Sequence, residues 1–205
     1  MTKQLGFYLN LQACTGCKAC QIACKDKNGL DVSLLWRKVV EISGGEWQLV
    51  DNIWRDNTFA YQVSLACMHC KRPFCQEVCP TKAITKRDDG IVLINGDICM
   101  GCRYCDWACP YDAPQFNPNT GTMTKCNLCV DYIDAGKAPA CVSACQMRVL
   151  EFGELDVLRQ KYGKLNDVFP LPDPSLTQPS VVFTPHRDVV HADADSAQIT
   201  NREEL

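Results

Sequence analysis

The chain has 205 residues, 46% of them hydrophobic, which suits one compact soluble domain or two very small ones. Its formal net charge of −3 argues against the basic surface of a nucleic-acid-binding protein. The unusual feature is the sixteen cysteines, which require disulfides, zinc or iron-sulfur chemistry as an explanation.

The N-terminal segment predicts a β-strand and not a signal peptide. Leu5, Phe7, Leu9 and Leu11 alternate with other residues at the period of a half-buried strand. No small-residue cleavage site or twin arginine precedes them, and no later run approaches the roughly 18 apolar residues that span a bilayer. We therefore expect a chain without an export signal or membrane span of its own, which would reach a membrane only through another subunit.

The cysteines fall into four groups of four. The first and third groups have the C-x2-C-x2-C-x3-C spacing of bacterial ferredoxins, whereas the second has a slightly longer loop and the fourth a much longer one. In chain order the groups are Cys14, Cys17, Cys20 and Cys24; Cys67, Cys70, Cys75 and Cys79; Cys99, Cys102, Cys105 and Cys109; and Cys126, Cys129, Cys141 and Cys145. Gly16 and Gly101 each precede the second cysteine of a group, where glycine permits a tight turn or a close approach of backbone to sulfur.

Residues 25–66 contain no cysteine and predict an inserted β-hairpin. Its strands are expected at residues 38–42 and 47–50, with the Ser-Gly-Gly sequence at 43–45 as the turn. The insertion contains Trp36, Trp47 and Trp54. The favoured interpretation is that these tryptophans pack over the metal sites, and the alternative is a partner interface, where tryptophan is enriched.

Two short segments follow the last cysteines of groups two and four in a similar pattern. Residues 79–84 and 145–150 each carry an apolar pair four and five positions after the cysteine, and each predicts a short helix. A turn at 88–90 and a strand at 91–94 then lead into the third group. His69 lies inside the second group, but that group already has four cysteines, so we interpret His69 as a structural loop residue and not a ligand.

The C-terminal part of the chain, from about residue 166 to 205, predicts an extended tail. It is polar and acidic toward its end, and five prolines interrupt any helix: Pro170, Pro172, Pro174, Pro179 and Pro185. Such a segment would be poorly ordered alone and would become ordered by lying across a partner.

Iron-sulfur clusters explain the cysteine spacing best. Zinc would leave the trailing x3-Cys unexplained, and disulfides would not explain four near-copies of one spacing. In two-cluster ferredoxins the fourth cysteine of a run ligates the other cluster, so the groups should work in crosswise pairs. Each oxidised cluster would add about −2, which brings the net charge to about −11. Basic residues near the cysteines would offset this charge or simply be solvated: Lys18, Lys25, Lys71, Arg72, Lys82, Arg103 and Lys125.

Several motifs resemble the iron-sulfur subunits of molybdopterin oxidoreductases, and especially the B subunits of the dimethyl sulfoxide reductase family. They are Cys14-Thr15-Gly16-Cys17-Lys18-Ala19-Cys20, Cys99-Met100-Gly101-Cys102-Arg103-Tyr104-Cys105, Cys109-Pro110-Tyr111 and Gly121-Thr122-Met123-Thr124-Lys125-Cys126. The resemblance covers nearly the whole chain. It implies an α+β fold with two pseudo-symmetric ferredoxin-type units, an outer unit of residues 1–24 and 126–165 and an inner unit of 67–125, with the hairpin insertion at 25–66 and the tail at 166–205.

The resemblance also implies which cysteines share a cluster, because in that family group one pairs with four and group two with three. The implied sets are Cys14, Cys17, Cys20 and Cys145; Cys24, Cys126, Cys129 and Cys141; Cys67, Cys70, Cys75 and Cys109; and Cys79, Cys99, Cys102 and Cys105. Groups two and three both end in Cys-Pro and groups one and four do not, which supports this pairing. Related nitrate reductase subunits have tryptophan at the position of Cys102 and hold a three-iron cluster. Since this chain has cysteine there, four [4Fe-4S] clusters are expected.

We therefore predict a non-catalytic electron-transfer subunit. A radical enzyme would need a cluster with only three cysteines, and a freely diffusing ferredoxin would not need the insertion and the tail. No Gly-rich nucleotide motif or P-loop is present. The resemblance implies a heterotrimer with a molybdopterin catalytic subunit and a membrane anchor that oxidises quinol. The negative charge implies that nucleic acid is not a partner. The resemblance also implies a peripheral position on the periplasmic side, after export with a twin-arginine partner.

Overall fold

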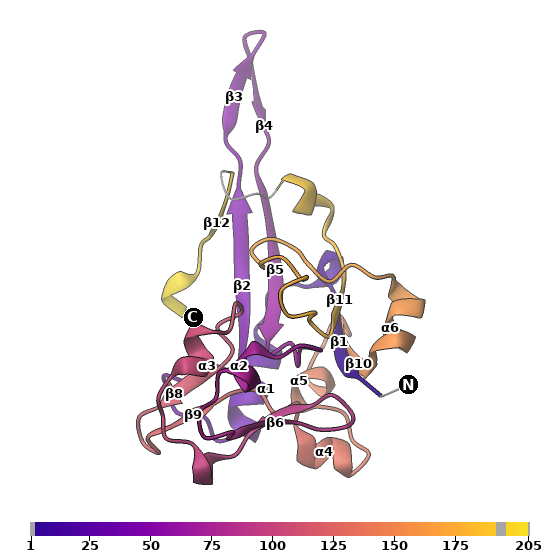
Figure 1. Ribbon diagram of the computed structural model, residues 1–205. Coiled ribbons are helices and arrows are strands. Elements are labelled where there is room, and N and C mark those ends of the chain that lie inside the picture. The colour runs from indigo at the N-terminus through magenta and orange to yellow at the C-terminus, as the bar shows by residue number, and fades with distance from the viewer. Residues whose placement is uncertain (1–2, 192–195, 205) are drawn as a thin grey trace.

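A computed structural model describes residues 3–191 and 196–204, which form a mixed α/β body with one long β-ribbon projecting from it (Figure 1). The strands are β1 (Leu5–Asn10), β2 (Arg37–Gly44), β3 (Trp47–Val50), β4 (Ile53–Asp56), β5 (Phe59–Ala66), β6 (Ile84–Lys86), β7 (Val92–Ile94), β8 (Gln115–Asn117), β9 (Thr122–Thr124), β10 (Leu150–Glu154), β11 (Val181–Thr184) and β12 (Ala197–Ile199). The α-helices are α1 (Ala19–Lys27), α2 (Phe74–Glu77), α3 (Tyr104–Trp107), α4 (Val130–Asp134), α5 (Ala140–Ser143) and α6 (Leu155–Tyr162). Short 3-10 turns are η1 (Leu11–Ala13), η2 (Gly96–Ile98), η3 (Arg187–His191) and η4 (Arg202–Glu204).

Strand β1 is the centre of a three-stranded sheet of order β10-β1-β11. It pairs antiparallel with β10, from Leu5 opposite Glu154 to Leu9 opposite Leu150, and parallel with β11 on its other side. The predicted N-terminal strand is therefore confirmed. Tyr8, between Phe7 and Leu9, is also buried, and its ring stacks on that of Tyr162 in α6, with 3.5 Å between the ring centroids.

The segment expected to be an extended tail contributes to the core, so that expectation is wrong. Strand β11 lies in the central sheet, and Val181, Val182 and Phe183 are buried. The preceding loop packs on the second cysteine group, where the Ser180 backbone amide donates to the Met68 carbonyl oxygen at 3.0 Å. The prolines do exclude a helix, but they leave the chain extended, and an extended segment can pair with β1 as a parallel strand.

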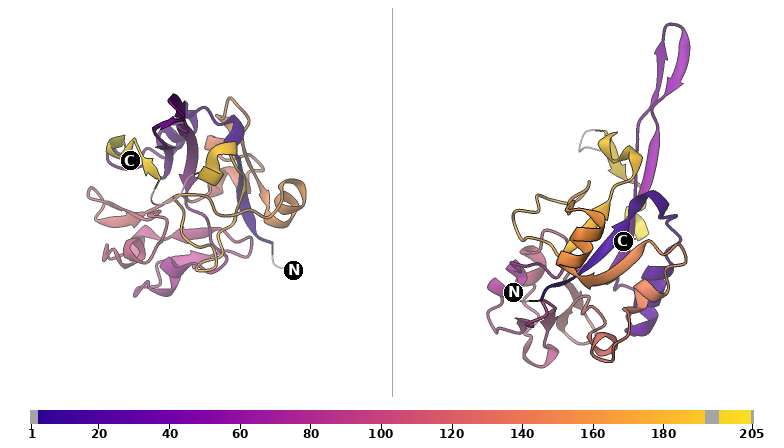
Figure 2. Two further views of the ribbon diagram at one scale, coloured as in Figure 1. Left: turned by 90° about the horizontal axis from the view of Figure 1, so that it is seen from above. Right: turned by 90° about the vertical axis from the view of Figure 1, so that its right-hand side faces the viewer.

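The projecting ribbon is made of β2 and β5, extended by β3 and β4 (Figures 1 and 2). Residues 37–44 pair with 59–66, and 47–50 pair with 53–56. The turn lies at Asp51 and Asn52, both with positive φ, and not at 43–45 as predicted. Asn and Asp tolerate this left-handed conformation, as the turn of a two-residue hairpin requires.

The favoured interpretation of the tryptophans is wrong for two of the three. Trp47 and Trp54 lie on β3 and β4 and are 62% and 64% exposed, so they do not pack over the cysteine groups. Trp36 is half-buried and its indole N–H donates to the Thr124 hydroxyl at 3.2 Å. A ribbon that leaves the body has no core to bury its side chains, which explains why the outer pair stays exposed.

The predicted helices at 79–84 and 145–150 are not formed. Helices α2 and α5 come before the last cysteine of each group, and the chain then turns through Lys82 and Arg148, which both have positive φ. A left-handed residue ends a right-handed helix. The similar segments lead instead into β6 and β10. The predicted strand at 91–94 is confirmed as β7, which pairs with β6.

No helix within residues 3–191 and 196–204 is long and apolar enough to cross a membrane. The pseudo-symmetry of two ferredoxin-type units and the boundaries proposed for them stay predictions. What the structure does show is that segments from both ends of the chain, β1, β10 and β11, build one sheet.

The burial of β11 predicts the outcome of two truncations. Removing residues 166–205 takes away the buried apolar side chains of Val168, Val181, Val182 and Phe183, each worth about 1.5–3 kcal/mol, against a typical stability of about 5–15 kcal/mol. We expect this variant to lose its cooperative thermal unfolding transition, measured by circular dichroism, and to lose iron. Removing only residues 196–205 keeps β11 and should keep both properties. A 166–205 deletion that melts like the full chain would contradict the placement of β11.

Candidate metal centres

Three cysteines of group one share a cavity with the last cysteine of group four. Cys14, Cys17, Cys20 and Cys145 line it, although 125 positions (145 − 20) separate the last two in the sequence. Helix α1 begins just after the loop, and Gly16 has a φ of +67°. A side chain at Gly16 would also come within 2.8 Å of Gln62, so glycine is required on both grounds.

Group three shares a second cavity with the last cysteine of group two. Cys99, Cys102, Cys105 and Cys79 line it. Here Gly101 has a φ of +69°, and an added Cβ would lie 2.3 Å from the Gly121 carbonyl oxygen. The expectation of tight turns at Gly16 and Gly101 is therefore confirmed.

A third cavity lies between the remaining cysteines of groups two and three. Cys67, Cys70, Cys75 and Cys109 line it, together with Lys125. The C-terminal segment reaches this site through Thr177. Its hydroxyl is hydrogen-bonded to the Tyr111 hydroxyl at 2.9 Å, and it also forms a hydrogen bond with the Cys70 thiol.

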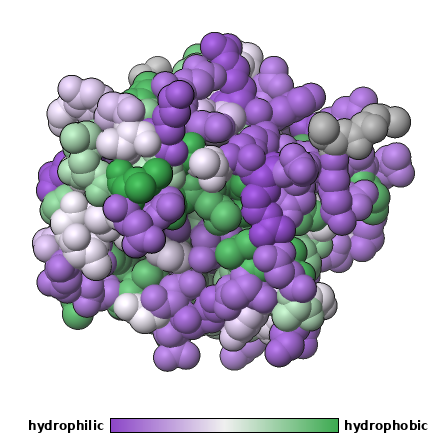
Figure 3. All heavy atoms as spheres, turned by 60° about the horizontal axis from the view of Figure 1, so that its bottom comes forward, coloured by the Kyte–Doolittle hydropathy of each residue, from purple (hydrophilic) through white to green (hydrophobic). Residues whose placement is uncertain are grey.

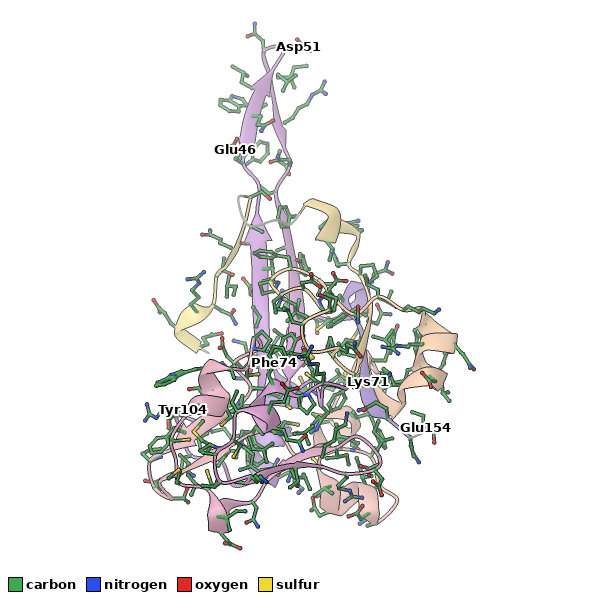
Figure 4. The ribbon with its side chains drawn as sticks, in the orientation of Figure 1. Glu46, Asp51, Lys71, Phe74, Tyr104 and Glu154 are labelled. Carbon is green, nitrogen blue, oxygen red and sulfur yellow. The ribbon has the colours of Figure 1, made fainter. Side chains whose placement is uncertain are left out.

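The last set, Cys24, Cys126, Cys129 and Cys141, is brought together where α1 packs against α5. Burial is the largest cause that raises the pKa of Cys24. Among the neighbouring cysteines, negative charge on Cys141 and on Cys129 adds to this effect. Burial raises the pKa of Cys126 most, and negative charge on Cys24, on Cys67 of the third set and on Cys141 adds to this effect. Three of the four sets named from the resemblance thus each line a cavity, and the sulfur atoms lie in the body below the ribbon (Figure 4).

The geometry of these sets suits a polynuclear cluster better than a single ion. All sixteen cysteines are free thiols. Within the described ranges, no three His, Cys, Asp or Glu side chains meet closely enough to hold one metal ion. The cysteines surround cavities instead, as ligands do when iron and sulfide fill the space between them. Four soft thiolate donors per cavity fit a [4Fe-4S] cluster.

Burial keeps most of these thiols protonated until a metal binds. Desolvation raises the pKa of Cys24, Cys70 and Cys75 to about 12 each, and that of Cys105 and Cys109 to about 11. Cys79 has the opposite shift: burial acts to raise its pKa, but hydrogen bonds from Thr81 and from nearby backbone amides outweigh burial and lower it. Cluster binding must therefore release protons, which couples it to pH.

Hydrogen-bond donors reach sulfur in at least three of the four sets. The Ser64 hydroxyl lies 3.3 Å from Cys20 Sγ, the Leu128 amide lies 3.4 Å from Cys126 Sγ, and the Met123 amide lies 3.4 Å from Cys99 Sγ. Such donors stabilise negative charge on sulfur, and they raise the reduction potential of a cluster.

Two cations are buried beside the cysteines, and sequence reasoning identifies only one of them. Lys125 is marked in the sequence by its place beside Cys126, and its burial excludes the solvated interpretation for this residue. Its ammonium group donates to the Cys126 carbonyl oxygen at 3.0 Å and to that of Val92. Arg37 is 2% exposed and escapes sequence reasoning, because it lies thirteen residues (37 − 24) after the nearest cysteine and no spacing marks it.

His69 is a structural residue, as interpreted. Its side chain is buried, and Nδ1 accepts a hydrogen bond from the Val92 amide at 3.0 Å. Burial, and then the charges of Lys125 and Lys86, hold its pKa well below the ordinary value, so the ring is neutral. Its carbonyl oxygen accepts from the Ser180 hydroxyl at 2.9 Å, which ties the second cysteine loop to the C-terminal segment.

Comparison with known proteins gives a consistent result. The model of the 4Fe-4S dicluster domain family matches residues 58–155. The B subunit of the anaerobic dimethyl sulfoxide reductase of Escherichia coli is 47% identical over 91% of both proteins, and YnfG of the same organism, a probable anaerobic dimethyl sulfoxide reductase subunit, is 44% identical over the full length of both. The B subunit of the polysulfide reductase of Wolinella succinogenes is 37% identical over 91% of this chain and 97% of its own length.

The placement of Cys141 and Cys145 predicts that substitutions at these two nearby positions loosen different segments of the chain. Cys145→Ala should remove a ligand from the cavity of Cys14, Cys17 and Cys20, so amide hydrogen exchange should rise at least about tenfold in residues 14–18. Cys141→Ala should instead raise exchange in residues 126–130. If Cys145→Ala deprotects 126–130 and leaves 14–18 unchanged, the crosswise assignment is wrong.

Proposed function

We propose, from the premise that this chain belongs to the iron-sulfur B subunits of the dimethyl sulfoxide reductase family, that it relays single electrons through four [4Fe-4S] clusters. The observation that best supports the proposal is that three cavities are each lined by four cysteines, which leaves Cys24, Cys126, Cys129 and Cys141 for a fourth cluster. When bound, each cluster would supply a one-electron redox couple. The chain supplies the ligands, the hydrogen bonds and the buried charges around it.

The sets lie in an order that suits a relay. Burial raises the pKa of Cys20 in the first set, and the negative charge of Cys141 in the second set adds to this effect. Burial likewise raises the pKa of Cys126 in the second set, and Cys67 of the third set is among the charges that add to it. Cys75 of the third set packs with Cys105 of the fourth in one buried group. These relations support a path for the electron from the first set through the second and third to the fourth.

Four cysteines per cluster favour conduction over catalysis at a cluster. Radical chemistry needs an iron with an open coordination position, and each of the four sets offers a full complement of thiolates. We therefore propose a non-catalytic subunit. The ends of the relay lie near the surface, because Cys17 is exposed and Tyr104, which follows Cys102 and Arg103, is 52% exposed (Figure 4).

The proposed partners are a molybdopterin catalytic subunit at one end of the relay and a membrane anchor that oxidises quinol at the other, in a heterotrimer. Support comes from the relatives, which are named as subunits of dimethyl sulfoxide and polysulfide reductases. A subunit of this kind would be attached to the membrane through its anchor. We propose the periplasmic side, reached by export with a partner that has a twin-arginine signal.

The projecting ribbon favours a fixed subunit over a freely diffusing ferredoxin. Large apolar side chains are exposed on both strands of its outer part: Trp47, Leu49, Val50, Ile53 and Trp54. The opposite end of the molecule is mainly hydrophilic, with separate apolar groups (Figure 3). Acidic residues outnumber basic ones on the outer part of the ribbon, residues 45–58, with Glu46, Asp51 and Asp56 against Arg55, which disfavours an anionic lipid surface as its contact. A protein subunit is the proposed contact.

Metal analysis of the native complex tests the proposed function. We expect molybdenum and about sixteen irons, four per cluster, for each copy of this chain in addition to any clusters of the partners. Redox titration followed by EPR should resolve four one-electron couples in this chain. Iron without molybdenum would favour a relay of a hydrogenase or formate enzyme, and fewer than four couples would contradict the ligand sets.

The exposed ribbon predicts a separable assembly defect. Replacing both Trp47 and Trp54 by Ser should leave the iron content unchanged, because neither residue is near the cysteines, and should reduce co-purification with the partner subunits at least about tenfold. Val32→Ser, which removes an apolar side chain that is 95% exposed on the body, is the matched control and should have no effect. Normal assembly of the double variant would show that the ribbon is not an interface.

A further inference from the structure

Arg37 is the most deeply buried charged side chain of the described residues. It begins β2, and its Nη1 donates to the Ser64 carbonyl oxygen at 3.2 Å and to the Ser64 hydroxyl at 3.0 Å. The guanidinium carbon lies 4.7 Å from the centre of the Phe7 ring on β1. Two strands and an aromatic ring therefore hold the group in one place.

The rest of the guanidinium has no acceptor in the part of the chain that the structure describes. Nε and Nη2 are both fully buried and have no hydrogen-bond partner among the described residues. Arg37 also makes no ion pair with any carboxylate in residues 3–191 and 196–204. Burying a cation and two free donors is costly, and native proteins keep such a group only where something compensates it. The compensating charge must come from the cysteines and what they hold.

The cysteines that surround Arg37 come from two different sets. Burial acts to lower the pKa of Arg37, but negative charge on Cys141, Cys20, Cys126 and Cys24 outweighs burial and raises it. Cys20 belongs to the first set and the other three belong to the second. The packing agrees with this, because α1, which carries Cys20 of the first set and Cys24 of the second, lies against β2, which begins at Arg37.

A hydrogen-bond chain links Arg37 to the first set alone. The Ser64 hydroxyl oxygen accepts from Arg37 Nη1, so its proton is directed to another acceptor, and Cys20 Sγ lies 3.3 Å away. Ser64 is itself buried. The arginine thus orients a hydroxyl that donates to one ligand of the first cluster.

We propose that Arg37 is a shared potential-setting residue of the two outer clusters, acting on both through its charge and on the first also through Ser64. This inference rests on the proposed function. Reduction adds a negative charge to a cluster, and a fixed positive charge in a region of low dielectric makes that addition more favourable. The same charge offsets the repulsion between two neighbouring clusters of about −2 each.

The inference is tested on the intact complex by redox titration followed by EPR. Arg37→Gln removes the charge and keeps a polar side chain of similar length. It should lower the reduction potentials of two of the four clusters, each by at least a tenfold change in the redox equilibrium, which is about 59 mV for one electron. Arg37→Lys keeps the charge and should restore most of both potentials. Ser64→Ala should lower only one potential, and it should be one of the same two.

The control is Arg87→Met, which removes a surface arginine that pairs with Asp134 and Asp89. It should leave all four potentials unchanged. Arg37→Gln with four clusters at unaltered potentials would overturn the inference and leave the proposed function standing. If Arg37→Gln fails to bind iron, the Ser64→Ala variant is the deciding test. Unchanged potentials of all four clusters in that variant would overturn the link from Arg37 through Ser64 to Cys20. A wild-type complex without four couples would remove both proposals.

Discussion

The burial of thiolate charge is the constraint on which the rest of the structure depends. Most of the sixteen cysteines are buried or half-buried, and desolvation raises the pKa of many of them above the ordinary thiol value, further from neutral pH. A protein that holds them as thiolates must supply metal, hydrogen bonds or cations nearby. The structure has donors on Cys20, Cys99 and Cys126, and it has two buried cations. The hydrogen-bond donors and the buried cations lie beside the cysteines because the thiolate charge is buried there.

The same constraint explains why distant parts of the chain are packed together. Each cavity takes three cysteines from one group and one from another, so a cluster would connect segments far apart in the sequence. The central sheet also connects distant segments, because β1 is paired with β10 and β11 from the other end of the chain. Closing such long loops is entropically costly, and metal binding is the interaction best able to offset that cost in a small protein.

Arg37 and the ribbon show how the scaffold extends the relay beyond its ligands. The strands that carry Arg37 and Ser64, β2 and β5, also form the base of the projecting ribbon. One end of this ribbon therefore lies against α1, which carries cysteines of the first two sets, and the other end presents exposed tryptophans. A contact made at the ribbon would be connected to the outer clusters by two successive pairs of strands, β3 with β4 and β2 with β5.

Sequence alone determined the features that depend on local spacing: the four cysteine groups, the glycines at Gly16 and Gly101, and the strands at β1 and β7. Local sterics and ligand geometry decide these within a few residues. Tertiary structure decided the rest. The ribbon turn, the strand β11 and the burial of Arg37 depend on which segments meet, and no short pattern records that. A proline-rich stretch is compatible with a tail or a strand, and only the open edge of β1 selects the strand, because pairing there satisfies its backbone hydrogen bonds.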